Sequence, residues 1–131
     1  MSKEIIQYRL DRAEETYQAA QFLATIKNWN SCINRLYYSC FYAVSALLLK
    51  DSLSSPKHTG VRSLFNKNYV KTGIISKDLA RLYNDLFERR HEADYADFVD
   101  FDESETIPLL HKTRVFLNEV SKTIATNPRK S

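Results

Sequence analysis

Glycine and proline are scarce in this chain, and their scarcity limits the fold more than any other feature of the sequence. Two glycines and three prolines are spread over 131 residues. A β-sandwich or β-barrel needs many tight turns, and such turns depend on these two residues. Apolar residues recur instead at spacings of three and four, which place them on one face of a helix. The sequence therefore predicts an all-α protein.

Four long helical segments and one short one account for most of the chain. The first begins near Ser2 and ends before a polar connection at Lys27–Asn30. The second runs from Trp29 or Asn30 to Lys50, and a short helix is expected around Thr59–Lys67. Together with two later helices, these segments predict an antiparallel bundle in residues 1–126. Residues 127–131 read as a loose tail.

The starts of the last two helices carry capping signals. Ser76 can cap the third long helix. Asp102 followed by Glu105 has the spacing of a capping box for the last helix. Pro108 conflicts with that start because it removes a backbone donor. The last helix therefore either begins later, near Thr106, or has a kinked first turn.

Cysteine and histidine are not placed as metal ligands. Cys32 and Cys40 lie about 12 Å apart along one predicted helix, which is too far for a disulfide. They are expected to be small buried thiols. His58, His91 and His111 share no ligand spacing with each other or with the cysteines, so the sequence predicts no metal site.

No cofactor motif and no membrane segment are visible. The stretch Lys71–Gly73 lacks the glycine-rich lead and the Gly-Lys-Ser/Thr order of a phosphate-binding loop. The longest run without a charged residue, Leu36–Leu49, is shorter than the about 20 residues that span a bilayer. No basic-then-apolar leader is visible at the N-terminus. We therefore expect a cytoplasmic protein with no cofactor and no membrane association.

Two arginines occur where the helix after Ser76 should present core residues. A helical projection places Arg90 inside the apolar stripe and Arg89 at its edge, whereas His91 points away. A guanidinium on an apolar face needs an acidic partner, a solvated cleft or a ligand. Conflicts of this kind are enriched at functional sites. The alternative is an arginine that extends to solvent or pairs within the bundle. The stripe consists of Leu79, Leu82, Tyr83, Leu86 and Ala93.

Charge is unevenly distributed, although the formal net charge is only +3. Lys57–Lys77 contains basic residues and no acid, whereas Glu92–Glu105 contains acids and no base. Such segments can meet phosphate and a basic partner respectively, or can be solvated surface. The helix that ends at Lys50 is apolar nearly all round, and its second face carries Arg35, Tyr38 and Tyr42. That face predicts contact with a second subunit or another partner.

Three stretches occur in register along the chain: NRLYYSCFYAVSALLL (Asn34–Leu49), HTGVRSLFNKNYVKTG (His58–Gly73) and LFERRHEADYADF (Leu86–Phe98). Together they resemble the HEPN family, the higher eukaryote and prokaryote nucleotide-binding domains. The resemblance covers roughly Lys3–Ile124. It implies an all-helical bundle, often a homodimer. Many members of that family are encoded beside a nucleotidyltransferase and act as toxin–antitoxin pairs.

Catalytic members of that family are metal-independent ribonucleases with an arginine and a histidine that are separated by four to six intervening residues. The histidine transfers a proton at the 2′-hydroxyl or the leaving oxygen, and the arginine stabilises phosphate charge. This chain has Arg89 and Arg90, but no histidine follows at that interval. A four-residue interval after Arg90 leads to Tyr95, and His91 is adjacent to Arg90.

Three functions remain open from the sequence. The first is a HEPN module that binds nucleotide or RNA phosphate through Arg89 and Arg90, with Arg35 as a secondary candidate, paired with a nucleotidyltransferase. The second is a ribonuclease toxin with an unusual site formed by the two adjacent arginines, His91 and Tyr95. The third is a structural adaptor that docks through the acidic segment.

Overall fold

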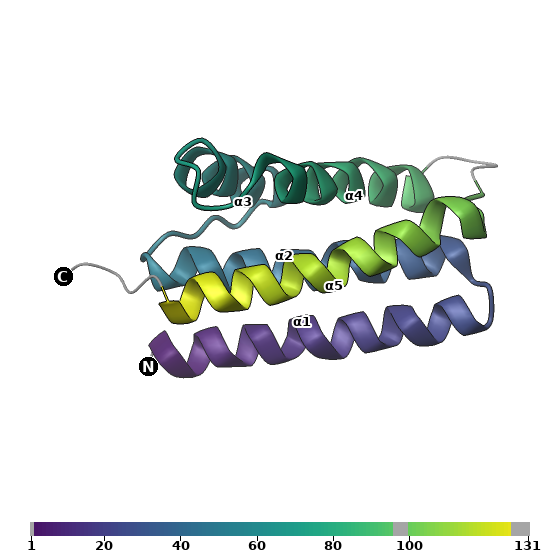
Figure 1. The fold of residues 1–131 in the computed structure, drawn as a ribbon, viewed down its shortest axis with the longest axis horizontal. Coiled ribbons are helices and arrows are strands. Elements are labelled where there is room, and N and C mark those ends of the chain that lie inside the picture. The colour runs from purple at the N-terminus through teal and green to yellow at the C-terminus, as the bar shows by residue number, and fades with distance from the viewer. Residues whose placement is uncertain (1, 96–99, 127–131) are drawn as a thin grey trace.

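Five α-helices and one π-helical turn make up the part of the chain that this computed structural model describes, residues 2–95 and 100–126 (Figure 1). The long helices run antiparallel to their neighbours in sequence, and no strand occurs in these residues. The predicted all-α bundle of four long helices and one short helix is confirmed. The elements are α1 (Ser2–Thr25), α2 (Trp29–Lys50), α3 (His58–Phe65), η1 (Asn66–Val70), α4 (Lys77–Tyr95) and α5 (Glu103–Thr126).

Helix α2 lies at the centre and contacts α1, α3, α4 and α5. In Figure 1, α1 lies along one side of α2 and α4 along the other. Leu36, Tyr37 and Cys40 are fully buried. This position explains why α2 is apolar nearly all round. Among the described helices, α2 alone has the length and hydropathy that a membrane span would also need, and 61% of that apolar window is buried in the bundle.

Small residues bring α1 close to α2. Ala13 and Ala20 are buried at the contact. The Ser39 hydroxyl of α2 donates to the Ala13 carbonyl at 2.7 Å. Helices approach closely where side chains at the contact are small. Cys32 and Cys40, also on α2, are free and buried, as the sequence predicts.

A capping box starts α5. The Glu105 amide donates to Asp102 Oδ1 at 2.9 Å, and the Asp102 amide lies 3.4 Å from Glu105 Oε1. The hydrogen bond from the Glu105 amide lowers the pKa of Asp102. The alternative start near Thr106 is wrong, because α5 begins at Glu103. Pro108 is the sixth residue of α5, so the helix lacks the N–H that would donate to the Ser104 carbonyl.

The short helix ends two residues earlier than predicted and continues into a π-turn. The amide of Lys71 donates to the Asn66 carbonyl at 2.8 Å, which is the spacing of a π-turn. The turn buries Tyr69, whose hydroxyl donates to the Leu47 carbonyl at 3.1 Å and also bonds Asp51. These contacts with α2 and the residue after it are tertiary, so the local sequence does not signal them. The predicted turn at Gly73 is present, with φ of +84°.

An ion pair joins α1 to α5 and predicts a pH-dependent stability. Arg114 donates to both oxygens of Glu14, at 2.7 and 2.8 Å. These bonds lower the pKa of Glu14 in the folded protein. The contribution is therefore present above the unfolded pKa and is lost as pH falls through the folded value. We expect Glu14→Gln to cost stability at pH 6 and less at pH 3, measured by urea unfolding. Glu15→Gln, an exposed neighbour, is the control, and a pH-independent cost of Glu14→Gln would contradict this assignment.

Candidate functional site

Arg90 lies in the core, in contact with aromatic rings. It is 9% exposed, as its place in the apolar stripe predicts. Its guanidinium carbon lies 4.8 Å from the centroid of the Tyr37 ring, 5.9 Å from that of Tyr38 and 5.8 Å from that of Phe87. A cation in contact with several ring faces is stabilised by their quadrupoles. Helices α2 and α4 therefore hold one buried positive charge between them.

The guanidinium of Arg90 is poorly satisfied by the other side chains of the described residues. Its nearest carboxylate oxygen in the described part of the chain is Asp94 Oδ2, 3.8 Å from Nη1. That distance is longer than a hydrogen bond. The Nε atom is buried and has no hydrogen-bond partner among the described residues. A buried donor without a partner costs about 1–3 kcal/mol. Such an arginine is suited to a ligand that brings an anion.

A polar network extends from Asp94 to Arg35. The amide nitrogen of Asn34 lies 3.2 Å from each oxygen of Asp94. The amide oxygen of Asn34 accepts from Arg35 Nε at 3.0 Å and Nη2 at 2.7 Å. A cavity of about 250 Å³ lies beside these residues, and Leu23 forms part of its wall. The structure thus places Arg35 and Arg90, two of the predicted phosphate-binding residues, at opposite ends of one network.

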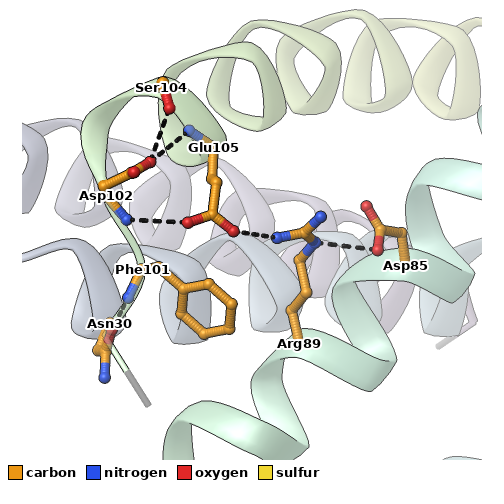
Figure 2. A network of polar contacts seen from close by, with 7 residues as sticks. All are labelled: Asn30, Asp85, Arg89, Phe101, Asp102, Ser104 and Glu105. Atoms are coloured by element: carbon orange, nitrogen blue, oxygen red, sulfur yellow. Dashed lines mark hydrogen bonds and ion pairs between the residues drawn. The ribbon is translucent and has the colours of Figure 1, made fainter.

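Arg89 is engaged elsewhere (Figure 2). Its Nε donates to Asp85 at 2.9 Å, and its Nη1 donates to Glu105 at 3.2 Å. Its guanidinium carbon also lies 5.7 Å from the Phe101 ring centroid. These contacts join α4 to the start of α5. Arg89 therefore pairs within the bundle, which is the alternative that the sequence leaves open for it.

The other predicted candidates, His91 and Tyr95, lie further along α4 than Arg90. His91 is exposed on α4. Tyr95 is the last residue of α4, and its side chain lies outside the described residues. Phe98 also lies outside the described residues, whereas Phe101, just before α5, is buried.

His58 is part of the site, although the sequence did not single it out as a functional residue. It is the first residue of α3, and its Nδ1 lies 2.9 Å from the Tyr37 hydroxyl. Its ring stacks on Phe41 with 4.4 Å between centroids and lies edge-on to Tyr38 at 5.7 Å. Burial and then the charge of Arg90 lower the pKa of His58. Its place at the head of the second family-like stretch was the available signal.

The residues that surround Arg90 and His58, together with these two, form a group that we name the aromatic–arginine cluster. A second cation borders it, because the guanidinium carbon of Arg62 lies 3.9 Å from the Phe87 ring centroid. Arg62 also pairs with Glu88 at 3.3 Å. The cluster offers positive charge, ring faces and an imidazole on three different helices. Such groups bind phosphate and stack bases. Its members are Tyr37, Tyr38, Phe41, His58, Phe87 and Arg90.

A larger groove, of about 780 Å³, lies between α4 and α5. Asp78, Asp85 and Glu88 line it together with Arg81 and Lys112 and with Leu82 and Leu109. Arg81 of this groove already pairs with Asp78, whereas the buried Nε of Arg90 has no hydrogen-bond partner among the described residues, so we place the candidate site at the aromatic–arginine cluster instead. Within the described ranges, His, Cys, Asp and Glu do not gather in groups of three or more that could hold a metal ion.

Comparison with known proteins agrees with this architecture. The family model described as "HEPN domain" matches residues 6–123. The chain is 41% identical over 122 residues to a UPF0332 protein of Thermotoga maritima, covering 93% of this chain and 92% of that protein.

Two relatives from Methanocaldococcus jannaschii carry a toxin name. The chain is 34% identical over 113 residues to "Putative toxin MJ0142", covering 86% of this chain and 77% of that protein. It is 31% identical over 123 residues to "Putative toxin MJ0605", covering 93% and 90% respectively. The family model and these relatives cover nearly the whole chain, and the resemblance seen in the sequence is confirmed: the chain belongs to the HEPN family.

Proposed function

We propose that this HEPN protein binds a nucleotide or single-stranded RNA at the aromatic–arginine cluster, with phosphate on Arg90. The observation that carries the proposal is the buried guanidinium of Arg90, whose Nε has no hydrogen-bond partner among the described residues. A phosphate would supply charged acceptors within hydrogen-bonding distance, which no described side chain offers to the Arg90 Nε.

Arg35 and the tyrosines extend the proposed site. The guanidinium carbon of Arg35 lies 5.1 Å from the centroid of the Tyr38 ring. Arg35 donates a hydrogen bond to Asn34, which in turn donates one to Asp94. A second phosphate along a strand could therefore meet Arg35. Tyr38 and Phe41 are only partly buried, so a base can reach their rings.

The biological setting is also a proposal. HEPN membership and the toxin names of two relatives support a role as one half of a toxin–antitoxin pair with a nucleotidyltransferase. The acidic segment is a less suitable docking surface than the sequence indicates. Asp94 and Glu105 bond residues of the bundle, and Asp102 caps α5. Co-purification with a nucleotidyltransferase encoded beside the gene tests the pairing.

Arg90→Ala is expected to weaken binding of a fluorescent RNA oligonucleotide at least about tenfold, because a hydrogen bond to a charged group contributes about 1.5–3 kcal/mol. Wild-type affinity should also fall as salt is raised from 50 to 200 mM, since phosphate binding releases counterions. Fluorescence anisotropy with RNA, and with mononucleotides as competitors, measures both effects.

Arg81→Ala is the matched control for this measurement. Arg81 lies on the same helix, its side chain is 76% exposed and it pairs with Asp78. The Arg81→Ala substitution removes the same charge as Arg90→Ala without touching the cluster. The RNA affinity of the Arg81→Ala variant should therefore stay within about twofold of wild type. Equal losses in the two variants would show only a general charge effect. No loss with Arg90→Ala would refute the proposed site.

A further inference from the structure

We infer that a second copy of this chain packs against α1, with the two α1 helices antiparallel across a two-fold axis. The surface that carries the inference is a line of residues along the outer side of α1, which we name the α1 stripe. The inference does not depend on the proposed binding of RNA, because α1 and the helix that carries Arg90 lie on opposite sides of α2 (Figure 1). The α1 stripe consists of Ile5, Tyr8, Arg12, Glu15, Ala19 and Phe22.

Large apolar side chains are exposed along the α1 stripe. Ile5, Tyr8 and Phe22 are 43%, 63% and 64% exposed, and Ile26, the residue after α1, is 57% exposed. These are four of the six exposed large hydrophobic residues in the described part of the chain, so they are concentrated on this helix. The face of α1 that packs on α2 is a different one and contains Ala13. Exposed apolar residues gathered on one face mark an interaction surface.

The spacing of the α1 stripe is that of a coiled-coil seam. Its positions alternate in steps of three and four residues from Ile5 to Phe22, which is the a and d pattern of a heptad repeat. Over these residues a helix rises about 26 Å. Two helices with such seams pack side by side at about 8–10 Å. The shape of the stripe therefore fits a second helix that lies along its whole length.

The α1 stripe is complementary to itself when it is reversed. Ile5 and Phe22 are equally far from the point midway between residues 13 and 14, and the same is true of Tyr8 and Ala19. An antiparallel second copy, with the two-fold axis at this point, places Ile5 against the partner's Phe22. It places Tyr8 against the partner's Ala19, so each ring meets a smaller side chain. A two-fold contact requires each residue to meet its counterpart in both directions, and the stripe meets this requirement.

The middle layer of the α1 stripe contains one base and one acid. Arg12 and Glu15 are also equally far from the axis, so the antiparallel arrangement sets Arg12 against the partner's Glu15. A parallel arrangement would set two copies of Arg12 against each other, and like charges in contact oppose association. Moving the antiparallel partner by one heptad would set Ile5 against the partner's Glu15. Charge therefore selects both the orientation and the register of the second copy.

Helix α2 holds Arg12 in place for this contact. The Nη2 atom of Arg12 donates to the Tyr42 hydroxyl at 3.3 Å, and the guanidinium carbon lies 5.2 Å from the centroid of the Tyr42 ring. The guanidinium has further N–H donors, which remain for a carboxylate of the partner subunit. Glu15 is exposed. Because Glu15 takes part in the contact, its use as a control for Glu14 requires protein concentrations at which the chain is monomeric.

Phe22→Glu is expected to raise the dissociation constant of the dimer at least about thirtyfold, the effect of losing an interface hot spot. The substitution places a carboxylate in an apolar layer on both halves of the contact. One pair of helices buries less than the about 800 Å² per partner of a standard interface, so we expect a wild-type dissociation constant on the order of 1–100 μM. Sedimentation equilibrium measures both values. A wild type that stays monomeric over this concentration range would overturn the inference.

Val115→Glu is the matched control, because Val115 is an apolar residue with a similar exposure, 56%, on α5. This variant should dimerise as wild type does. Loss of the dimer with Val115→Glu, or its retention with Phe22→Glu, would overturn the inference. If circular dichroism shows that Phe22→Glu does not fold, Tyr8→Glu takes its place with the same expectation.

A mixture of two charge variants tests the antiparallel register. Arg12→Glu presents two acids in the middle of the α1 stripe and Glu15→Arg presents two bases, so each variant alone should dimerise at least about tenfold more weakly than wild type. Mixed in equal amounts, the two should form a heterodimer that is tighter than either homodimer, because each acid then meets a base. Sedimentation of fluorescently labelled Arg12→Glu with unlabelled Glu15→Arg measures this association. Absence of the heterodimer would overturn the inferred pairing.

Discussion

Replacement of Phe116 by alanine is expected to lower the free energy of unfolding by about 3–5 kcal/mol. Phe116 is fully buried on α5. Its ring lies 6.0 Å from that of Phe65 on α3 and 6.1 Å from that of Tyr83 on α4. Truncation removes the apolar contact between three helices and leaves a cavity that they cannot fully close. Urea unfolding followed by circular dichroism measures the loss.

Val115→Ala is the control for this substitution. Val115 precedes Phe116 on the same helix and is 56% exposed. Truncation at an exposed position away from caps and pairs changes stability by about 0.5 kcal/mol or less. Similar losses at the two positions would mean that α5 does not pack as described.

Arg90→Met is expected to raise the free energy of unfolding by about 1 kcal/mol or more while RNA binding is lost. The substitution gives up cation–π contacts worth about 0.5–2 kcal/mol. It removes a buried unsatisfied donor that costs about 1–3 kcal/mol, and the methionine keeps buried the apolar volume that the arginine stem already fills. Asp94 keeps both hydrogen bonds from Asn34, so it is not left without a partner. The gain exceeds the loss.

Urea unfolding curves of wild type and Arg90→Met measure the change in stability, and Arg81→Met is the control. Arg81 lies on the surface of the same helix, so its replacement should change stability by about 0.5 kcal/mol or less. If Arg90→Met instead unfolded the protein readily, Arg90 would be a structural residue, and its burial would no longer argue for a ligand.

Local signals predicted the helices and the position of Arg90. Ser76 and Asp102 cap the helices that the sequence assigns to them, with Leu79 and Glu105 as the respective amide donors. Helical periodicity alone places Arg90 on the apolar face of α4, and the residue is buried there. These features depend on residues within one or two turns of each other.

The residues that gather around Arg90 in the cluster could not be predicted from local signals. His58 lies on another helix, and only the folded bundle brings it to Tyr37. One of the two carboxylates that bond Arg89 was equally unpredictable, because Glu105 belongs to the next helix. The π-turn after α3 depends on contacts of Tyr69 with Leu47 and Asp51. Periodicity assigns a side chain to a face, but it does not say which residue of another helix faces it.

The central position of α2 has a consequence for protein engineering. One stretch of this helix, Asn34–Phe41, carries the amide that holds Asp94 and three aromatic members of the cluster. The opposite side of the same stretch includes Leu36 and Cys40, which form the middle of the bundle core. The site therefore cannot be moved to another scaffold as a surface patch. A transplant would have to carry this stretch as a core segment, together with one arginine and one histidine from the helices that pack on it.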